Sequence, residues 1–176
     1  FSEQFIWLDD DLWDDELKEL EKQNMVPSLP ADKWSLLRRI YFDLIGLPPS
    51  YDDVQRFVNG QESYEQVVDR LLASPQYGER WGRHWLDVAG YADSEGYTND
   101  DRVRPYAYKY RDYVIRAFNL DMPFDRFTVE QLAGDLLPKP TPQQITATGF
   151  NRNHGVTASG ISEEYRVEYV LDRVRT

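Results

Sequence analysis

Apolar residues recur along most of this chain at the spacing of one face of an α-helix. The stretch from Trp34 to Ile45 places Leu37, Ile40 and Tyr41 on one side. Equivalent stripes follow in three further stretches, which carry Val67, Val68, Leu71 and Leu72, then Trp81, Trp85, Val88, Ala89 and Ala92, then Tyr106, Tyr110, Tyr113, Val114, Ala117 and Phe118. Apolar positions three and four residues apart predict amphipathic helices, and no alternating run is long enough for a sheet. We therefore expect an all-α fold.

Residues that begin and end helices divide the pattern into short elements. Asp32 is suited to cap a helix, and Ser or Thr followed three residues later by a polar acceptor marks further starts at Ser50, Ser63 and Thr128. Thr141 precedes a proline, which is favoured in the first turn of a helix. The helices expected from these signals cover residues 10–23, 34–45, 50–59, 63–74, 76–92, 105–119, 128–137, 141–150 and 162–176. Together they predict a compact irregular array of about eight short helices, with an acidic N-terminal arm.

The composition indicates a folded domain. The 176 residues are 41% hydrophobic and 14% aromatic, which is too apolar for a disordered chain. No apolar run approaches the roughly 20 residues that a membrane-spanning helix needs, so we expect no transmembrane segment. We expect an arm at residues 1–30 that docks on a partner and a single helical domain at residues 31–176.

Negative charge is concentrated at the start of the chain. The net charge is −11, and residues 1–30 alone contain nine acidic and two basic side chains. Phosphates would be repelled, so the charge argues against a nucleic-acid partner. It favours a basic protein partner, or simply a solvated acidic surface. The arm also carries the large apolar side chains that we expect to anchor it on that partner, namely Phe1, Phe5, Ile6, Trp7 and Trp13.

The chain contains no cysteine and two histidines. Disulfides, thiolate metal sites, thiol catalysis and haem attached through Cys-x-x-Cys-His are therefore excluded within it. A zinc site of three histidines is excluded as well. We expect no cofactor in this chain, with haem only on a partner.

One group of residues suggests a catalytic alternative. Arg80, His84, Asp87 and Tyr91 form a second stripe on the helix expected over residues 76–92. A histidine with a carboxylate one turn away can act as an oriented general base, as in a hydrolase or carbohydrate-processing domain. The alternative interpretation is a histidine satisfied by hydrogen bonds where two helices meet. We favour the structural role, because no nucleophile motif lies nearby.

A second group suggests a metal alternative. Asp93, Glu95, Asp100 and Asp101 cluster in one loop, and dense oxygen ligands are what calcium prefers. The spacing does not match an EF-hand loop, and nearby arginines could neutralise the same acids. A calcium-stabilised structural module therefore stays an alternative. We also expect buried bidentate contacts from arginines such as Arg104, Arg111 and Arg173 to Asp87, Asp135 or Asp172, which would fix helix register.

Five stretches of the chain resemble a known family in the same order. They are LLRRIYFDLIGLPPS (36–50), YEQVVDRLLASPQYGERWGRHWLDVAGYADSEGY (64–97), RPYAYKYRDYVIRAFNLDMPFDRFTVEQLAGDLLP (104–138), ATGFNRN (147–153) and EEYRVEYVLDRV (163–174). The chain resembles the planctomycete-specific, cytochrome-associated domain of unknown function found in bacterial extracytoplasmic proteins. Long members of that family are similar to secreted multidomain proteins with a cytochrome c-like module. The resemblance thus implies a periplasmic or otherwise extracytoplasmic location.

These observations lead to one expected function. We expect a non-catalytic accessory or docking subunit of an extracytoplasmic, membrane-associated electron-transfer complex that bears a cytochrome, respiratory or photosynthetic. An acidic surface would steer a basic cytochrome or another basic subunit toward the chain.

Overall fold

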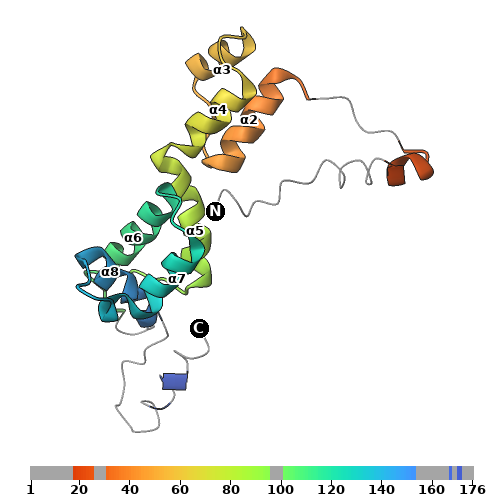
Figure 1. Ribbon diagram of the computed structural model, residues 1–176. Coiled ribbons are helices and arrows are strands. Elements are labelled where there is room, and N and C mark those ends of the chain that lie inside the picture. The colour runs from red at the N-terminus through yellow and green to blue at the C-terminus, as the bar shows by residue number, and fades with distance from the viewer. Residues whose placement is uncertain (1–17, 26–30, 96–100, 154–166, 168–169, 172–176) are drawn as a thin grey trace. The chain divides into compact units, whose positions relative to one another are not determined.

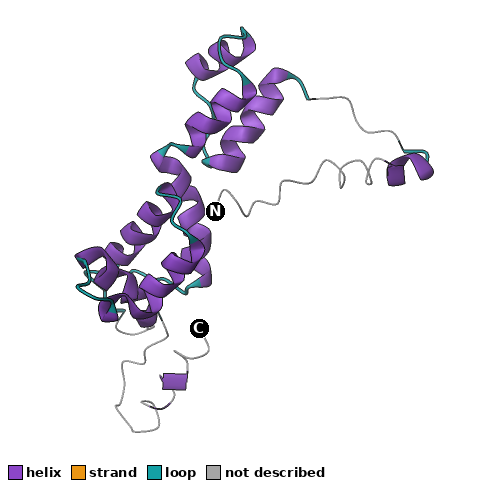
Figure 2. Ribbon diagram, viewed as in Figure 1, coloured by secondary structure: helices purple, strands orange, loops and turns teal. Residues whose placement is uncertain are grey.

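The computed structural model describes residues 18–25, 31–95, 101–153, 167 and 170–171. Within these ranges every regular element is a helix, as Figure 2 shows. The described residues outside the helices form one isolated antiparallel bridge, between Ser94 and Val103. The expected all-α fold is therefore confirmed. The contacts divide the chain into two compact units, residues 1–70 and residues 71–176, and we describe each by itself.

The first unit contains three short helices with locally encoded ends (Figure 1). They are α2 (Lys33–Leu44), α3 (Tyr51–Val58) and α4 (Tyr64–Leu72), whose last two residues belong to the second unit. The Asp32 carboxylate accepts the Ser35 backbone N–H at 2.9 Å. Ser50 with Asp53, and Ser63 with Gln66, form the expected reciprocal caps of α3 and α4. The predicted starts of these helices are confirmed.

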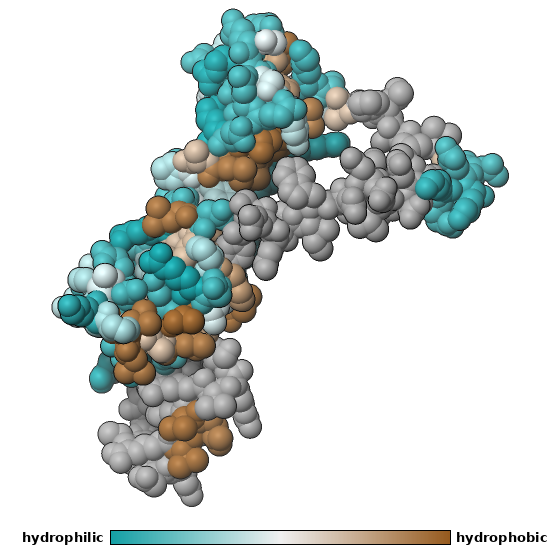
Figure 3. All heavy atoms as spheres, in the orientation of Figure 1, coloured by the Kyte–Doolittle hydropathy of each residue, from teal (hydrophilic) through white to brown (hydrophobic). Residues whose placement is uncertain are grey.

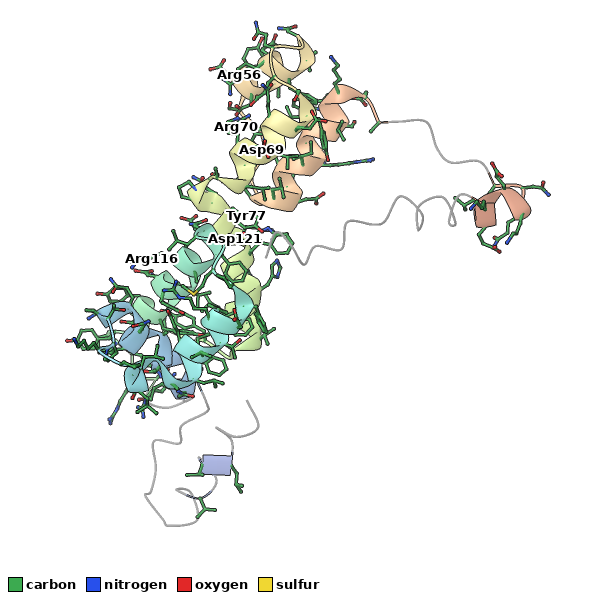
Figure 4. The ribbon with its side chains drawn as sticks, viewed as in Figure 1. Arg56, Asp69, Arg70, Tyr77, Arg116 and Asp121 are labelled. Carbon is green, nitrogen blue, oxygen red and sulfur yellow. The ribbon has the colours of Figure 1, made fainter. Side chains whose placement is uncertain are left out.

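The first unit buries the apolar side chains of Leu37, Ile40, Tyr41, Phe57 and Val67. An arginine that makes two hydrogen bonds to one carboxylate links its helices. Arg70 on α4 donates to both carboxylate oxygens of Glu62, at 2.8 and 3.0 Å, and to the Tyr41 hydroxyl at 3.1 Å. Its hydrogen bonds and charge hold the pKa of Glu62 below its usual range, although partial burial opposes this. Figure 4 labels Arg70 and its neighbour Arg56 in this unit. The network links α2 to α4 through a fixed geometry.

The second unit packs longer helices around aromatic rings. Its elements are α5 (Pro75–Val88), α6 (Tyr108–Asn119), α7 (Phe124–Ala133), the 3-10 turn η1 (Gly134–Leu136), α8 (Pro142–Ala147) and the 3-10 turn η2 (Thr148–Arg152). Its core consists of Leu86, Tyr110, Tyr113, Val114, Ala117, Phe127 and Ala147. The Trp85 ring contacts Phe127 edge-on, with centroids 5.0 Å apart, and Phe127 stacks on Tyr113 at 6.0 Å. Aromatic packing therefore joins α5, α6 and α7.

Helices α5 and α6 approach closely because α5 buries glycines. Gly78 and Gly82 are buried, and a Cβ at Gly78 would lie 2.6 Å from Oδ1 of Asn119. The sequence pattern had predicted a face that includes Val88, but Val88 is 79% exposed. The predicted burial of Val88 is therefore wrong. Helix α5 contacts α6 through Gly78 and Gly82, and a pattern of hydrophobic side chains cannot predict a contact made by glycines.

The first turn of α5 is capped by a residue of α6. Ser74, directly before α5, donates its hydroxyl to the Gln76 side chain and accepts no backbone N–H of the helix with its own side chain. Instead, Asn119 accepts the Gly78 N–H at 2.8 Å and donates to the Pro75 carbonyl at 3.1 Å. Nearby, burial and the charge of Asp121 raise the pKa of Tyr77 (Figure 4). The α5–α6 contact thus also satisfies backbone groups that a helix leaves unpaired at its start.

Several helix boundaries differ from the sequence prediction, among them the start of α6, which lies at Tyr108 and not at residue 105. Helix α7 begins at Phe124, not at Thr128, because the expected cap uses its side chains differently. Thr128 donates back to the Phe124 carbonyl at 2.8 Å, within the helix. The proline at 75 begins α5 as well as ending the helix before it, and α5 stops at Val88 ahead of Gly90, which has a φ of 66°. The Thr141 cap before α8 is confirmed.

No helix in the described ranges is long and apolar enough to cross a membrane. The predicted arm at residues 1–30 lies largely outside the described residues. It stays a prediction, as does the single domain expected over residues 31–176.

Candidate functional site

A buried, hydrogen-bonded amide lies in the second unit. Gln131 on α7 is buried, and its Oε1 accepts from the Trp85 indole N–H at 2.9 Å and from the Tyr110 hydroxyl at 2.6 Å. Its Nε2 donates to the Phe127 carbonyl at 3.2 Å. One side chain from each of α5 and α6 is thus tied to α7. A satisfied buried network of this kind fixes the rotation of a helix against its neighbours.

A buried carboxylate sits beside this amide on the same helix. Glu130 is only 3% exposed and accepts hydrogen bonds from Arg126 at 2.9 Å, Tyr113 at 3.1 Å and Gln144 at 3.2 Å. Burial alone would raise the pKa of Glu130, but these three donors and the Arg126 charge outweigh it and lower the pKa. The same burial and the nearby carboxylate raise the pKa of Tyr113. Glu130 therefore stays ionised inside the unit.

The polar interior of α7 has a consequence for its outer side. Because Glu130 and Gln131 face inward with Phe127, apolar residues of α7 and η1 point to solvent. Val129, Leu132 and Leu136 follow one another at spacings of three and four residues, and Leu132 and Leu136 are 57% and 80% exposed. We call these three side chains, with the exposed Phe124, the α7 apolar face. Figure 3 shows apolar residues at the surface of the second unit among hydrophilic ones.

Acidic side chains border the α7 apolar face. Asp125 precedes Val129 by one helical turn, and Asp135 lies directly before Leu136; both are exposed. The exposed apolar residues of α7 and η1 thus have exposed carboxylates on both sides in the chain, with the exposed Arg126 next to Asp125. Exposed apolar rows with a polar border are typical of protein-binding surfaces.

The predicted catalytic pair lies on the exposed side of α5. Both His84 and Asp87 are exposed. The His84 ring lies 5.5 Å from the Trp81 ring, and Asp87 lies 4.0 Å from Arg83. Among the described residues no hydrogen bond joins His84 to Asp87. The catalytic alternative stays a prediction, with each residue engaged by a different neighbour.

The predicted calcium ligands are only partly described. Asp93 accepts the Tyr91 hydroxyl at 2.6 Å and lies 3.9 Å from Arg111, which supplies positive charge where a cation would bind. Glu95 directly follows Ser94 and Asp101 lies two residues before Val103, the two residues that form the isolated bridge. Asp100 lies outside the described residues. Within the described part of the chain no three acidic or histidine side chains converge as a metal site, and the calcium alternative stays a prediction.

The residues predicted to anchor the arm cannot be placed. Phe1, Phe5, Ile6, Trp7 and Trp13 all lie outside the described residues, and their role in binding a partner stays a prediction. The α7 apolar face was not singled out from the sequence. Its signal was present, because Val129, Leu132 and Leu136 have the spacing of one helical face, but that spacing alone predicts burial.

The chain matches one protein-family model over most of its length. The model of the family PSCyt2, described as a protein of unknown function (DUF1549), matches residues 16–176. No curated protein and no solved structure matches. The chain belongs to the PSCyt2 family.

Proposed function

We propose that this PSCyt2-family chain is a non-catalytic accessory subunit that docks on an extracytoplasmic, membrane-associated electron-transfer complex bearing a basic cytochrome. The α7 apolar face carries this proposal. It is a set of apolar side chains exposed on a helix that buries the polar residues Glu130 and Gln131 on its inner side. The extracytoplasmic location and the cytochrome as partner come from the family resemblance, and the docking role from the surface.

The buried residues of α7 hold the helix in place, which lowers the entropic cost of binding a partner at the α7 apolar face. Phe127, Glu130 and Gln131 hold α7 from within by ring contacts and hydrogen bonds to α5, α6 and α8. A surface that is already ordered loses little conformational freedom when a partner binds. The apolar side chains on it are therefore suited to act as contact residues.

The charge around the face favours a basic partner. Asp125 and Asp135 border the apolar row, and the whole chain carries a net charge of −11. Opposite charge on a partner accelerates encounter and sets orientation, while apolar contacts hold the complex. A basic cytochrome whose apolar patch is surrounded by lysines meets both conditions.

The proposal is tested by binding a purified c-type cytochrome of net positive charge to the purified chain, using isothermal titration calorimetry. The informative variant is Leu132→Asp combined with Leu136→Asp. Loss of a hot-spot residue at the centre of an interface costs about 2 kcal/mol or more, so we expect Kd to rise about 30-fold or more. The added carboxylates would strengthen long-range attraction to a basic partner, so a loss reports the apolar contact and the cost of burying a carboxylate in its place.

The matched control is Val88→Asp combined with Leu120→Asp. These residues are 79% and 66% exposed in the same unit, and the double variant adds the same charge away from the α7 apolar face. We expect its Kd to be equal to or lower than that of the native chain. The proposal fails if the basic cytochrome does not bind, or if both double variants bind it equally well.

A further inference from the structure

A cleft of about 560 Å³ lies in the second unit, away from the α7 apolar face. Its walls are the segment leading into α6, the first turn of α6, and α8 with η2. A volume of this size is in the range of roughly 300–1,000 Å³ that is typical of sites for small organic ligands. The docking proposal does not use it, and the sequence predictions gave Glu95 and Arg104 other roles.

The charge of this cleft is opposite to that of the chain. Among the described residues that line it are the cations Arg104, Lys109 and Arg152 and the carboxylate of Glu95. The Arg104 guanidinium is half-buried and donates to the Arg152 carbonyl at 3.4 Å. A guanidinium has five N–H donors, so this bond leaves capacity for an acceptor in the cleft. Positive charge gathered at one concave place in an acidic protein favours an anionic ligand.

An unpaired donor supplies a second, independent observation. Asn153 lines the cleft, and its side-chain Nδ2 is buried without a hydrogen-bond partner among the described residues. Buried polar atoms are nearly always paired, and an exception calls for a partner such as a bound molecule. Because this nitrogen has almost no accessible surface, a carboxylate held by Arg104 can accept from it only after the amide turns toward the cleft.

The remaining lining is aromatic and apolar. Tyr110 forms part of the wall, and Gly149 allows η2 to approach it closely, because a Cβ there would lie 3.0 Å from the Tyr110 Cβ. The Tyr106 ring is 70% exposed beside it, with the Lys109 ammonium 5.0 Å from the ring centre. Tyrosine faces next to cations are suited to a ligand with a flat ring attached to its charge.

We infer that this cleft binds a small organic carboxylate with a ring-sized body. Arg104 and Asn153 hold the carboxylate, Lys109 and Arg152 contribute charge, and Tyr106 and Tyr110 contact the ring. The site is independent of the docking surface, so either proposal can fail without the other.

The test is a calorimetric titration of the full chain with two carboxylates of different body, 4-hydroxybenzoate and glucuronate. The neutral comparisons are 4-hydroxybenzamide and glucose. We expect at least one carboxylate to bind with a Kd of about 1 mM or lower, and its neutral counterpart to bind at least about tenfold more weakly. Tighter binding of 4-hydroxybenzoate would show that the site prefers an aromatic ring, and tighter binding of glucuronate that it prefers a hydroxylated sugar ring. Inorganic phosphate is the third probe, and binding as tight as that of both carboxylates would overturn the inference in favour of a general anion site.

Two variants separate a binding role from a structural one. Arg104→Gln should weaken carboxylate binding at least about tenfold, whereas Arg83→Gln, at an exposed arginine outside the cleft, should leave it unchanged. Asn153→Leu removes the unpaired donor and should weaken binding without lowering the melting temperature. Native-like affinity in both cleft variants, or an equal loss in Arg83→Gln, would overturn the inference.

Discussion

Glu130 stabilises the folded chain through its ionised form, and this gives its contribution a pH dependence. Its pKa in the folded state is lowered from the ordinary value of 4.5. On acidification the unfolded chain therefore takes up this proton first, so the contribution is complete above about pH 4.5 and is lost as the pH falls through the folded pKa. Replacing Glu130 by Gln removes the titration. We expect the variant to be less stable near pH 7 by about 1–3 kcal/mol, since buried donors lose a charged acceptor.

The measurement is urea unfolding of both proteins, followed by tryptophan fluorescence, from about pH 7 to about pH 3. The stability difference between native chain and Glu130→Gln should shrink below about pH 4.5. The control is Asp125→Asn, an exposed carboxylate on the same helix, which should stay within about 0.5 kcal/mol of the native chain throughout. A difference for Glu130→Gln that is constant with pH would contradict the assignment.

At the scale of single residues, the sequence predicts roles that depend on close neighbours in the chain. Asp32, Ser50 and Thr141 cap helices as expected, because each accepts a backbone N–H only three residues away. Roles that depend on distant partners were missed. Arg70 was not among the arginines expected to make bidentate contacts; its bidentate partner Glu62 lies before α4, and its further acceptor Tyr41 is 29 residues away.

The same distinction explains the other arginine predictions. Of the arginines expected to bind buried acids, Arg104 instead donates to a backbone carbonyl, and Arg111 lies near Asp93 and Asp112. Arg173 lies outside the described residues. An arginine within a helical pattern indicates a charge on a surface, but only the packing of several elements decides which acid it meets.

At the scale of elements, the contact between α5 and α6 depends on the missing side chain of Gly78. A Cβ there would collide with the Ile115 carbonyl and with Asn119, which caps α5. Replacing Gly78 by Ala should therefore destabilise the chain by about 1–3 kcal/mol, as overpacking does, even though Ala favours helices. Thermal unfolding monitored by circular dichroism measures the change.

Gly82, one turn later on the same helix, is the matched control. A Cβ at Gly82 would lie 3.5 Å from Val114 and Ile115, which is ordinary contact. Gly82→Ala should be neutral or stabilising by up to about 1 kcal/mol through helix propensity. Equal stability of the two variants would show that the close approach at Gly78 is not tight.

The sequence predicted which segments are helices better than it predicted which side of a helix is buried. The expected stripes on residues 34–45 and 105–119 are largely confirmed, since bulky residues such as Leu37 and Tyr113 make those contacts. The stripe on α5 failed at Val88, where glycines take over the contact. For α7, the side that buries Gln131 is specified by hydrogen bonds to Trp85 and Tyr110, which no periodicity of hydrophobic residues encodes.

At the scale of the whole molecule, the hydrophobic pattern predicted the fold class but not the candidate site. Apolar residues at helical spacing and the lack of long alternating runs were sufficient to predict an all-α chain. The α7 apolar face has the same spacing as a core stripe, so its exposure follows only from the burial of Glu130 and Gln131 on the opposite side. The division at residues 70 and 71 falls near the end of α4 and left no break in the hydrophobic pattern.

The acidic arm is the remaining part of the docking proposal, and it predicts a kinetic difference. Residues 1–24 carry nine acidic and two basic side chains. Deleting them removes long-range attraction to a basic cytochrome, so we expect a lower association rate with a weaker dependence on salt. It also removes Phe5, Trp7 and Trp13, which we expect to anchor the complex, so co-purification with the partner should be abolished. We expect circular dichroism to show that the helices from α2 onward persist, because buried residues between Leu37 and Ala147 pack these helices together.

Surface plasmon resonance against the immobilised cytochrome separates this effect from that of the α7 apolar face. The Leu132→Asp and Leu136→Asp double variant keeps the arm and its charge, so its association rate should be retained while its dissociation accelerates. The deletion should instead slow association. If the deleted chain associates as fast as the native one and at the same salt dependence, steering by the arm is refuted. If it also dissociates no faster, its aromatic residues are not anchors, and docking would depend on α7 alone.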